Sequence, residues 1–174
     1  MPLNKNIIDK YVSNKSVFVE TGSWLGHGIE IALNCGFEEI ISIELAEKYF
    51  NICNEKFKNN KNVKIILGDS CEVLFNLIEE IDKPITFWLD GHYSGADTGF
   101  GKFEYPLIQE LEQIKKHKDN THIILIDDMR LFRNKKETLF DVNNIIEKII
   151  TINENYKIFY GNGHTKNDIL IAKI

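Results

Sequence analysis

Apolar residues alternate along the chain between short continuous runs and runs spaced by three or four positions. The short runs are rich in Ile, Val, Phe and Leu and predict strands buried on both faces, while the spaced runs predict helices with one apolar face. We expect strands at 17–20, 39–44, 63–67, 85–89, 122–126, 156–160 and 168–174, and helices near 4–13, 25–36, 46–57, 70–81, 106–114 and 142–150. Five strand–helix units followed by two strands predict a parallel sheet covered by helices, with at least one antiparallel strand from the closing hairpin.

The turn after the first predicted strand is rich in glycine. Glu20 ends that strand, and Gly22, Gly26 and Gly28 follow in the pattern E-x-G-x-x-x-G-x-G. Glycine lets the backbone turn tightly and lets a ligand come close to it. The pattern differs from the dinucleotide-binding fingerprint G-x-G-x-x-G, because Trp24 stands at the second glycine position. A nicotinamide dehydrogenase is therefore disfavoured, and an ordinary packing turn is the alternative to a ligand-binding turn.

Five predicted strands end in acidic residues, namely Glu20, Glu44, Asp69, Asp90 and Asp127. In open α/β sheets ligands bind outside the carboxyl ends of the strands, so these acids should gather at one binding edge. Glu44 lies some 20 residues beyond the glycine turn, where an acid can accept hydrogen bonds from a ribose diol. The alternative is that the acids only cap the helices that follow, which is the simpler role for Asp69.

Together, the glycine turn and the strand-end acids resemble the class I S-adenosylmethionine (SAM) methyltransferases over nearly the whole chain. The resemblance implies one domain over residues 1–174 with a Rossmann-like, seven-stranded α/β sheet of order 3-2-1-4-5-7-6 and an antiparallel strand 7. It implies SAM as cofactor, with the glycines against its methionine part and Glu44 on its ribose. Asp69 and Ser70 would border the adenine, and Glu20 would orient the turn or the SAM amino group. The cofactor-binding residues expected in this way are Glu20, Gly22, Ser23, Gly26, Gly28, Glu44, Asp69, Ser70 and Asp90.

A second, narrower resemblance concerns two acidic segments. Residues 88–93 (WLDGHY) and 124–128 (ILIDD) are similar to the paired acid motifs of metal-dependent O-methyltransferases, both catechol-type and macrolide-sugar-type. This implies a divalent cation held by Asp90, Asp127 and Asp128. Neighbouring strands lie about 4.8 Å apart, so carboxylates at their ends can share an ion, and without one they would repel. Oxygen-only ligands suit Mg²⁺, and also Ca²⁺ or Mn²⁺. The alternative is that Asp127 and Asp128 merely cap a turn.

His92 marks a departure from the catechol-type pattern, in which a lysine base follows the strand-four acid. Here His92 and Tyr93 stand at that place, and we expect His92, together with Asp90, to be catalytic. Histidine titrates near neutral pH and can act as a general base, although a polar surface role is the plainer interpretation. Of the other histidines, His27 and His164 are candidates to flank the site. His117 and His122 are expected to be structural.

The composition bears on the class of protein and on its expected location. Hydrophobic residues make up 43% and charged residues 27% of the chain, an ordinary balance for a water-soluble domain. A net charge of −5 argues against a general nucleic-acid binder, and no apolar run reaches the roughly 20 residues of a membrane span. Three widely spaced cysteines without a C-x-x-C pair are typical of a reducing compartment, and we expect a cytoplasmic protein.

The leading hypothesis is therefore O-methylation of a hydroxylated small molecule or sugar by SAM, assisted by a divalent cation. A metal-independent N-methyltransferase and a non-catalytic SAM-binding subunit are the alternatives. Neither nucleic acid nor membrane is an expected partner. Only residues 91–101 and 129–137 are left to shape an acceptor pocket, so we expect an open site or one completed by a second subunit in a homodimer. The glycines of residues 91–101 predict a mobile lid over that site.

Overall fold

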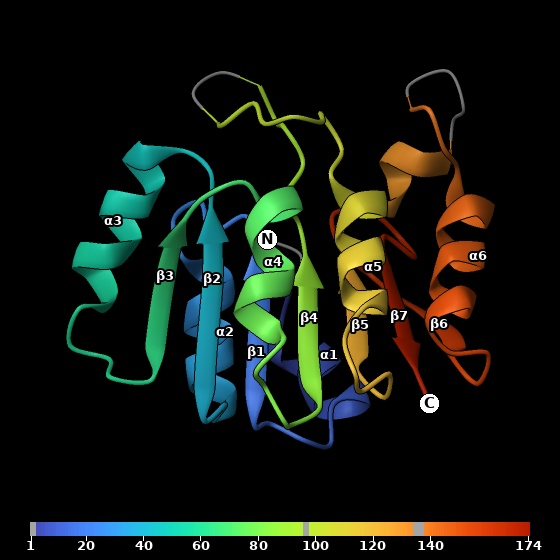
Figure 1. Cartoon of the computed structure of the whole chain (residues 1–174), viewed down its shortest axis with the longest axis horizontal. Helices are drawn as coiled ribbons and strands as arrows, with labels where there is room; N and C mark the ends of the chain where they lie inside the picture. Colours follow the sequence, from blue (N-terminus) through green and yellow to red (C-terminus); the bar gives the residue numbers. More distant parts are fainter. Residues whose placement is uncertain (1–2, 96–97, 134–137) are drawn as a thin grey trace.

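The computed structural model describes residues 3–95, 98–133 and 138–174. Seven strands form one sheet in the order β3-β2-β1-β4-β5-β7-β6 (Figure 1). β1 to β5 pair in parallel, and β7 runs antiparallel to both β5 and β6. The predicted strand order and the antiparallel strand are therefore confirmed. The strands are β1 (Val17–Thr21), β2 (Glu39–Glu44), β3 (Val63–Leu67), β4 (Ile85–Leu89), β5 (Ile123–Ile126), β6 (Lys157–Gly161) and β7 (Ile169–Lys173).

Helices cover both faces of the sheet, as Figure 1 shows for α4 and α5 on one side and α1 and α2 on the other. They are α1 (Lys5–Tyr11), α2 (His27–Cys35), α3 (Glu47–Phe57), α4 (Ser70–Ile78), α5 (Leu107–Lys115) and α6 (Val142–Ile152), with a 3₁₀ helix η1 (Met129–Arg133) after β5. In the described parts of the chain no helix is long and apolar enough to cross a membrane. The predicted acceptor segments are covered in part, because residues 96–97 and 134–137 lie outside the described residues.

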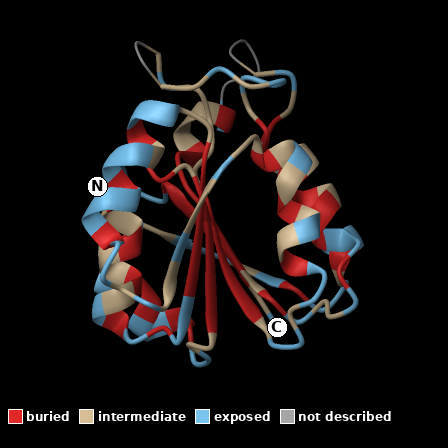
Figure 2. Cartoon of the chain, turned by 60° about the vertical axis from the view of Figure 1, so that its left-hand side comes forward, coloured by how far each residue is buried: buried red, intermediate tan, exposed pale blue. Residues whose placement is uncertain are grey.

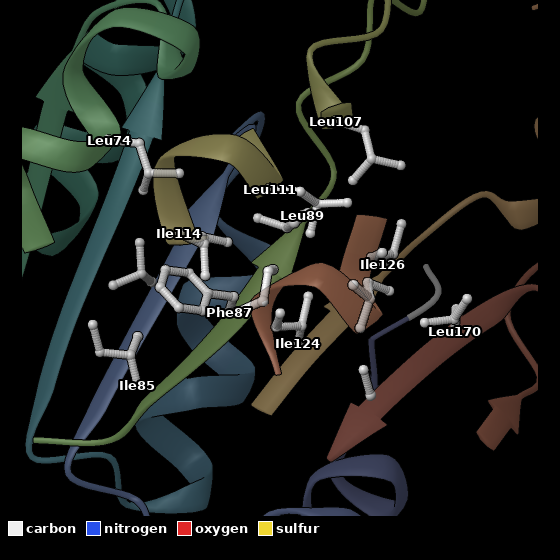
Figure 3. Close-up of a cluster of buried hydrophobic side chains, with 14 of the residues drawn as sticks. Leu74, Ile85, Phe87, Leu89, Leu107, Leu111, Ile114, Ile124, Ile126 and Leu170 are labelled. Atoms are coloured by element: carbon white, nitrogen blue, oxygen red, sulfur yellow. The ribbon is translucent and has the colours of Figure 1, made fainter. Parts of the chain in front are cut away.

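The core is divided by the sheet into two apolar layers. Side chains alternate along each strand, so Val17 and Val19 join the layer under α4, α5 and α6, while Phe18 joins the layer under α1, α2 and α3. Figure 3 shows the first layer, in which Phe87 of β4 lies beside Ile114 of α5. Figure 2 shows the buried residues concentrated along the strands between the helices. Burial on both faces explains why the strands are nearly continuous apolar runs.

The turns that start the helices follow local rules visible in the sequence. Asp69 caps α4, accepting the backbone N–H of Cys71 at 2.9 Å. Asp141 opens α6 with a capping box shared with Asn144. α2 lies between two glycines in the left-handed conformation, Gly26 before it and Gly36 after it, with φ of 78° and 82°. These two glycines have the same backbone requirement but different surroundings.

Replacing each of the two glycines by alanine separates backbone strain from steric overlap. A Cβ at Gly36 would meet nothing within 4 Å, whereas a Cβ at Gly26 would overlap the ring of Phe57. We expect Gly36→Ala to lower the free energy of unfolding by about 1 kcal/mol, the cost of a left-handed alanine. Gly26→Ala should cost about 2–4 kcal/mol, because overpacking adds to that strain. Urea unfolding measures both, and equal losses would contradict the packing role of Gly26.

Candidate active site

A cavity of about 810 Å³ opens at the edge of the sheet where the parallel strands end. Its size is typical of pockets that hold small molecules or cofactors. The residues that follow β1, β2, β3, β4 and β5 all contribute to its wall, as expected for an open α/β sheet. Of the predicted site residues, those that line the cavity are Glu20, Gly22, Ser23, Gly28, Glu44, Asp69, Ser70, Asp90, His92, Asp127 and Asp128.

Gly26 is the one predicted site residue that does not line this cavity. Its hydrogen-only side chain faces the ring of Phe57 in α3, so packing accounts for the glycine and its predicted contact with a cofactor has no support here. Gly22 and Gly28 differ from it. A Cβ at Gly22, where φ is 85°, would overlap the carbonyl of Asp90, and a Cβ at Gly28 would overlap the carboxylate of Glu20. These two glycines therefore let neighbouring site elements approach one another.

Glu20 is a buried acid at the end of β1, only 1% exposed. Its Oε2 accepts a hydrogen bond of 2.6 Å from Ser42, whose oxygen also lies 2.6 Å from that of Ser23. Burial raises the pKa of Glu20 to about 8, although the hydrogen bond from Ser42 opposes this shift. A cationic group of a ligand placed beside Glu20 would favour its ionised form, because opposite charges lower a carboxyl pKa.

Glu44 organises the same turn from the end of β2. Its Oε2 accepts the backbone N–H of Trp24 and its Oε1 that of Ala46, each at 2.8 Å. Trp24 is held in a left-handed conformation with φ of 44°, and its side chain is 50% exposed at the cavity wall. Each carboxylate oxygen has a further lone pair, so Glu44 can still accept ligand hydroxyls while it holds the turn.

Asp69 joins the end of β3 to the loop after β4. Besides capping α4, it accepts the backbone N–H of Lys102 through Oδ2 at 3.0 Å. Gly99 and Gly101 pack closely against Leu45 and Asp69, so the described part of this loop extends from β4 across to the ends of β2 and β3. The loop thus covers part of the cavity mouth. Its mobility stays a prediction.

Asp90 and Asp128, which follow β4 and β5, lie on either side of the imidazole of His92. Nδ1 of His92 is 3.5 Å from Asp90 Oδ1, and Nε2 is 3.3 Å from Asp128 Oδ2. The His92 ring stacks on Tyr105, with centroids 6.3 Å apart and planes 12° apart. Burial lowers the pKa of His92, but the two carboxylates outweigh burial and the net shift is upward. Both ring nitrogens of the imidazole therefore face carboxylate oxygens.

Asp127 is the most buried of the three acids predicted to hold a cation, with 3% of the residue exposed. Its Oδ1 accepts the backbone N–H of Asp128 at 2.7 Å, while its buried Oδ2 has no hydrogen-bond partner among the described residues. Burial, followed by the charges of Asp90 and Asp128, raises the pKa of Asp127 to about 9. A buried carboxylate oxygen without a donor is costly, so this atom is suited to meet a cation.

Two further residues of the cluster, Arg130 and Asp168, are not indicated by the sequence patterns. Arg130 pairs with Asp128 and, at 2.7 Å, with Asp168 Oδ2, and its backbone N–H donates to Asp168 Oδ1 at 2.9 Å. Asp168 is fully buried just before β7. Burial raises its pKa, but the bonds from Arg130 prevail and hold the pKa below its usual value. The pairing joins residues 38 positions apart, so no local spacing could have indicated it.

Comparison with known proteins shows which solved structures share this architecture. No family model and no curated protein sequence matches the chain. Solved structures do match, at low identity. An O-methyltransferase from Bacillus cereus in complex with S-adenosylhomocysteine has a TM-score of 0.63 and 14% identity over 98% of this chain and 78% of that one. Fibrillarin from Aeropyrum pernix with bound SAM has a TM-score of 0.62 and 9% identity over 92% and 67%. The chain has the class I methyltransferase fold.

A third structure with this methyltransferase fold is a candidate rRNA methylase from Clostridium thermocellum, with a TM-score of 0.61 and 16% identity over 98% of this chain and 95% of that one. The fold predicted from the sequence is thus confirmed by both strand order and structural likeness. One neighbour is named as an O-methyltransferase and another for rRNA, so the acceptor class has to be argued from this chain's own residues.

Glu110 of α5 supports the main cavity and was not predicted. It is 1% exposed and accepts a hydrogen bond of 2.6 Å from Ser70, at the start of α4. A Cβ at Gly91 would lie within 3.1 Å of Glu110 and 3.2 Å of Thr21, so the loop after β4 rests directly on both side chains. Burial raises the pKa of Glu110 to about 7, against the hydrogen bonds of Ser70 and Thr21.

A second groove of about 550 Å³ lies between α5 and α6 and shares Phe103 with the main cavity. Its floor is aromatic. Phe140 stacks on Phe132 at 5.2 Å, and Phe132 meets Tyr105 edge to face at 5.7 Å. Because Tyr105 also stacks on His92, rings connect the acid cluster to the groove.

The remaining histidines divide as expected. His117 and His122 are buried and 3.1 Å apart, and His122 Nδ1 accepts the backbone N–H of Ile85 at 3.1 Å, which confirms their structural role. His27 and His164 both line the main cavity.

Glu110→Gln tests the raised pKa through the pH dependence of stability. A carboxyl pKa of about 7 in the folded protein, against an ordinary 4.5, means that the folded state binds the proton more tightly. The resulting stabilisation is complete below pH 4.5 and is lost as the pH rises through 7. We expect the wild type to lose up to about 3 kcal/mol more than Glu110→Gln between pH 5 and pH 8.

Urea unfolding across that pH range measures the difference, with Glu112→Gln as the matched control on the same helix. The pKa of Glu112 is lowered by Lys148, so its titration falls below the tested range. Parallel pH profiles for the wild type and Glu110→Gln would contradict the assignment.

Proposed function

We propose that this protein is a SAM-dependent methyltransferase that methylates a hydroxyl oxygen of a small molecule or sugar with the help of a divalent cation. One observation carries the proposal. The acid cluster of Asp90, Asp127 and Asp128 lines the same cavity as the glycine turn and Glu44. A site that only bound SAM would not need a second group of carboxylates beside it.

The cofactor part of the proposal uses the residues after β1, β2 and β3. Gly22 and Gly28 leave room for the methionine part, and the ammonium of SAM would neutralise Glu20, whose pKa is raised by burial. Glu44 would accept the ribose hydroxyls, and Asp69 with Ser70 would border the adenine. Bound SAM or S-adenosylhomocysteine in neighbours of the same fold supports this assignment.

Glu44→Gln tests the cofactor site. We expect the SAM affinity to fall at least tenfold, about 1.4 kcal/mol, because a neutral amide accepts hydroxyl hydrogen bonds less strongly than a carboxylate. Isothermal titration calorimetry measures the affinity, and circular dichroism checks that the turn held by Glu44 is intact. Glu39→Gln is the matched control, since Glu39 is exposed at the other end of β2. Equal SAM affinity in the wild type and Glu44→Gln would argue against the ribose role.

Methyl transfer from SAM is an in-line displacement, in which the carbon–sulfur bond breaks as the carbon–oxygen bond forms. The protein therefore acts mainly by positioning donor and acceptor. A divalent cation would lower the pKa of the acceptor hydroxyl. Asp90, Asp127 and Asp128 would hold it, and they fit the task because Asp127 Oδ2 is buried without a donor among the described residues. A positive ion would also relieve the repulsion that raises the pKa of Asp127.

The general-base role predicted for His92 has weaker support. Both ring nitrogens face carboxylate oxygens, and the pKa of the ring is raised. In this arrangement both nitrogens already have polar neighbours, since Nε2 also lies 3.2 Å from the hydroxyl of Ser94. His92 is therefore better placed to act within the acid cluster than to take a proton from the acceptor.

The groove between α5 and α6 favours a small-molecule acceptor. It adjoins the main cavity through Phe103 and offers an apolar wall on which the body of an acceptor can lie while its hydroxyl points to the acid cluster. An RNA acceptor is the competing class, given the rRNA methylase among the structural neighbours. The net charge of −5 disfavours it, because RNA binding relies on cationic contacts to phosphates.

Chelation and Asp127→Asn test the metal requirement. With methyl-labelled SAM and a panel of phenols and sugars, we expect EDTA or Asp127→Asn to abolish transfer while SAM affinity stays within a few-fold. Without metal, Asp127→Asn should unfold at the same or a higher urea concentration than the wild type, because an amide replaces a buried carboxyl crowded by other acids. Full transfer in EDTA would contradict metal assistance and favour a metal-independent transferase.

A further inference from the structure

We propose that His92 is a nitrogen ligand of the ion at the acid cluster, and that the ion is therefore a first-row transition metal rather than Mg²⁺ or Ca²⁺. The inference rests on the proposed metal-assisted function and specifies its ion. It also changes the ligand set expected from the sequence, which contained carboxylate oxygens alone.

The geometry places His92 inside the ligand set. Asp90, His92 and Asp128 each present one ligand atom, and these atoms all lie within 4.8 Å of one another. The His92 side chain is 17% exposed, and its two nitrogens lie 3.5 Å and 3.3 Å from the carboxylate oxygens of Asp90 and Asp128. Stacking on Tyr105 fixes the plane of the imidazole. An ion held between the two carboxylates would therefore meet the imidazole as well.

Asp127, next to Asp128 in the chain, gives a second observation that points to a cation. Its Oδ2 is buried and has no partner among the residues that the structure describes, although the residue itself is only 3% exposed. Asp90 and Asp128 are the charges that act on it most strongly. A cation beside Asp90 and Asp128 would supply the partner that this oxygen lacks. All four side chains line the open cavity, so an ion can reach them from solvent.

The neighbouring acid group already contains a bound cationic side chain. Asp127, Asp128 and Asp168 also have ligand atoms within 4.8 Å of one another. There, however, Arg130 pairs with both Asp128 and Asp168. Arg130 takes Oδ1 of Asp128, while Oδ2 of the same carboxylate faces His92. Asp128 can thus serve Arg130 with one oxygen and an ion with the other.

The nitrogen determines which ions are favoured. Mg²⁺ and Ca²⁺ are hard ions that bind oxygen ligands, and Mg²⁺ gives up its water reluctantly. Imidazole suits iron, nickel, copper and zinc, and affinity rises along the first row from Mn²⁺ to Cu²⁺. One imidazole beside the carboxylates of Asp90 and Asp128 therefore favours a transition metal over Mg²⁺. Co²⁺ is a convenient probe, because its visible absorption reports the ligands directly.

The test uses the whole chain after removal of metal with EDTA. Calorimetry measures the affinities for Co²⁺ and Mg²⁺ in the wild type, His92→Ala and His92→Gln, and visible spectroscopy follows bound Co²⁺. We expect the wild type to bind Co²⁺ at least tenfold more tightly than Mg²⁺. Both His92 variants should lose at least tenfold in Co²⁺ affinity and change the Co²⁺ spectrum, while their Mg²⁺ affinity stays within threefold. His164→Ala, which removes another histidine of the cavity, should bind Co²⁺ as the wild type does.

Two results would overturn the inference, and they differ in what they leave standing. Unchanged Co²⁺ affinity and spectrum in His92→Gln, with its fold verified by circular dichroism, would exclude His92 as a ligand but keep a metal site built from the acids. Failure of the wild type to bind either ion, with methyl transfer undiminished by EDTA, would remove the metal from the proposed function itself. His92 would then act only as the cation between Asp90 and Asp128.

Discussion

The crowding of carboxyl groups at one edge of the sheet is the constraint on which the rest of the site depends. Glu20, Asp90 and Asp127 lie at the ends of neighbouring parallel strands. Glu20 and Asp127 are buried and Asp90 is partly buried, and the pKa of each is raised chiefly by burial. The chain compensates this charge in different ways. Ser42 donates a hydrogen bond to Glu20, and His92 lies beside Asp90, while Asp127 keeps one oxygen without a partner among the described residues. The uneven compensation distinguishes the Glu20 end of the cavity from the Asp127 end.

The sequence predicts the fold well because its signals are local and repeated. Apolar runs alternate with amphipathic spacing, and an acid or a glycine stands at or just after the end of each of the first six strands, so strands and helices can be assigned from local segments. The order of the strands depended on resemblance to a known family, since alternation alone does not determine which strands are neighbours. Boundaries differ by one to three residues, as at α4, which ends at Ile78 rather than at 81.

The site was predicted where residues follow strands and was missed where distant segments meet. Asp90 and Asp127 are visible as acids at strand ends, but Asp168 was only the start of a strand, and its partner Arg130 only a residue in a loop. Glu110 was not predicted, because nothing in its own segment shows that Ser70 faces it. Gly26 fits a ligand-binding pattern, and the ring of Phe57 by itself explains why no larger residue stands there. Its contact with a cofactor stays a prediction.

The pairing of Arg130 with Asp168 makes the acid cluster depend on a segment far along the chain. β7 lies between β5 and β6, which brings Asp168, just before β7, to the turn after β5. There Asp168 anchors Arg130, which also pairs with Asp128, a residue held in a left-handed conformation with φ of 55°. The antiparallel strand therefore supports a group of acids that themselves follow the parallel strands.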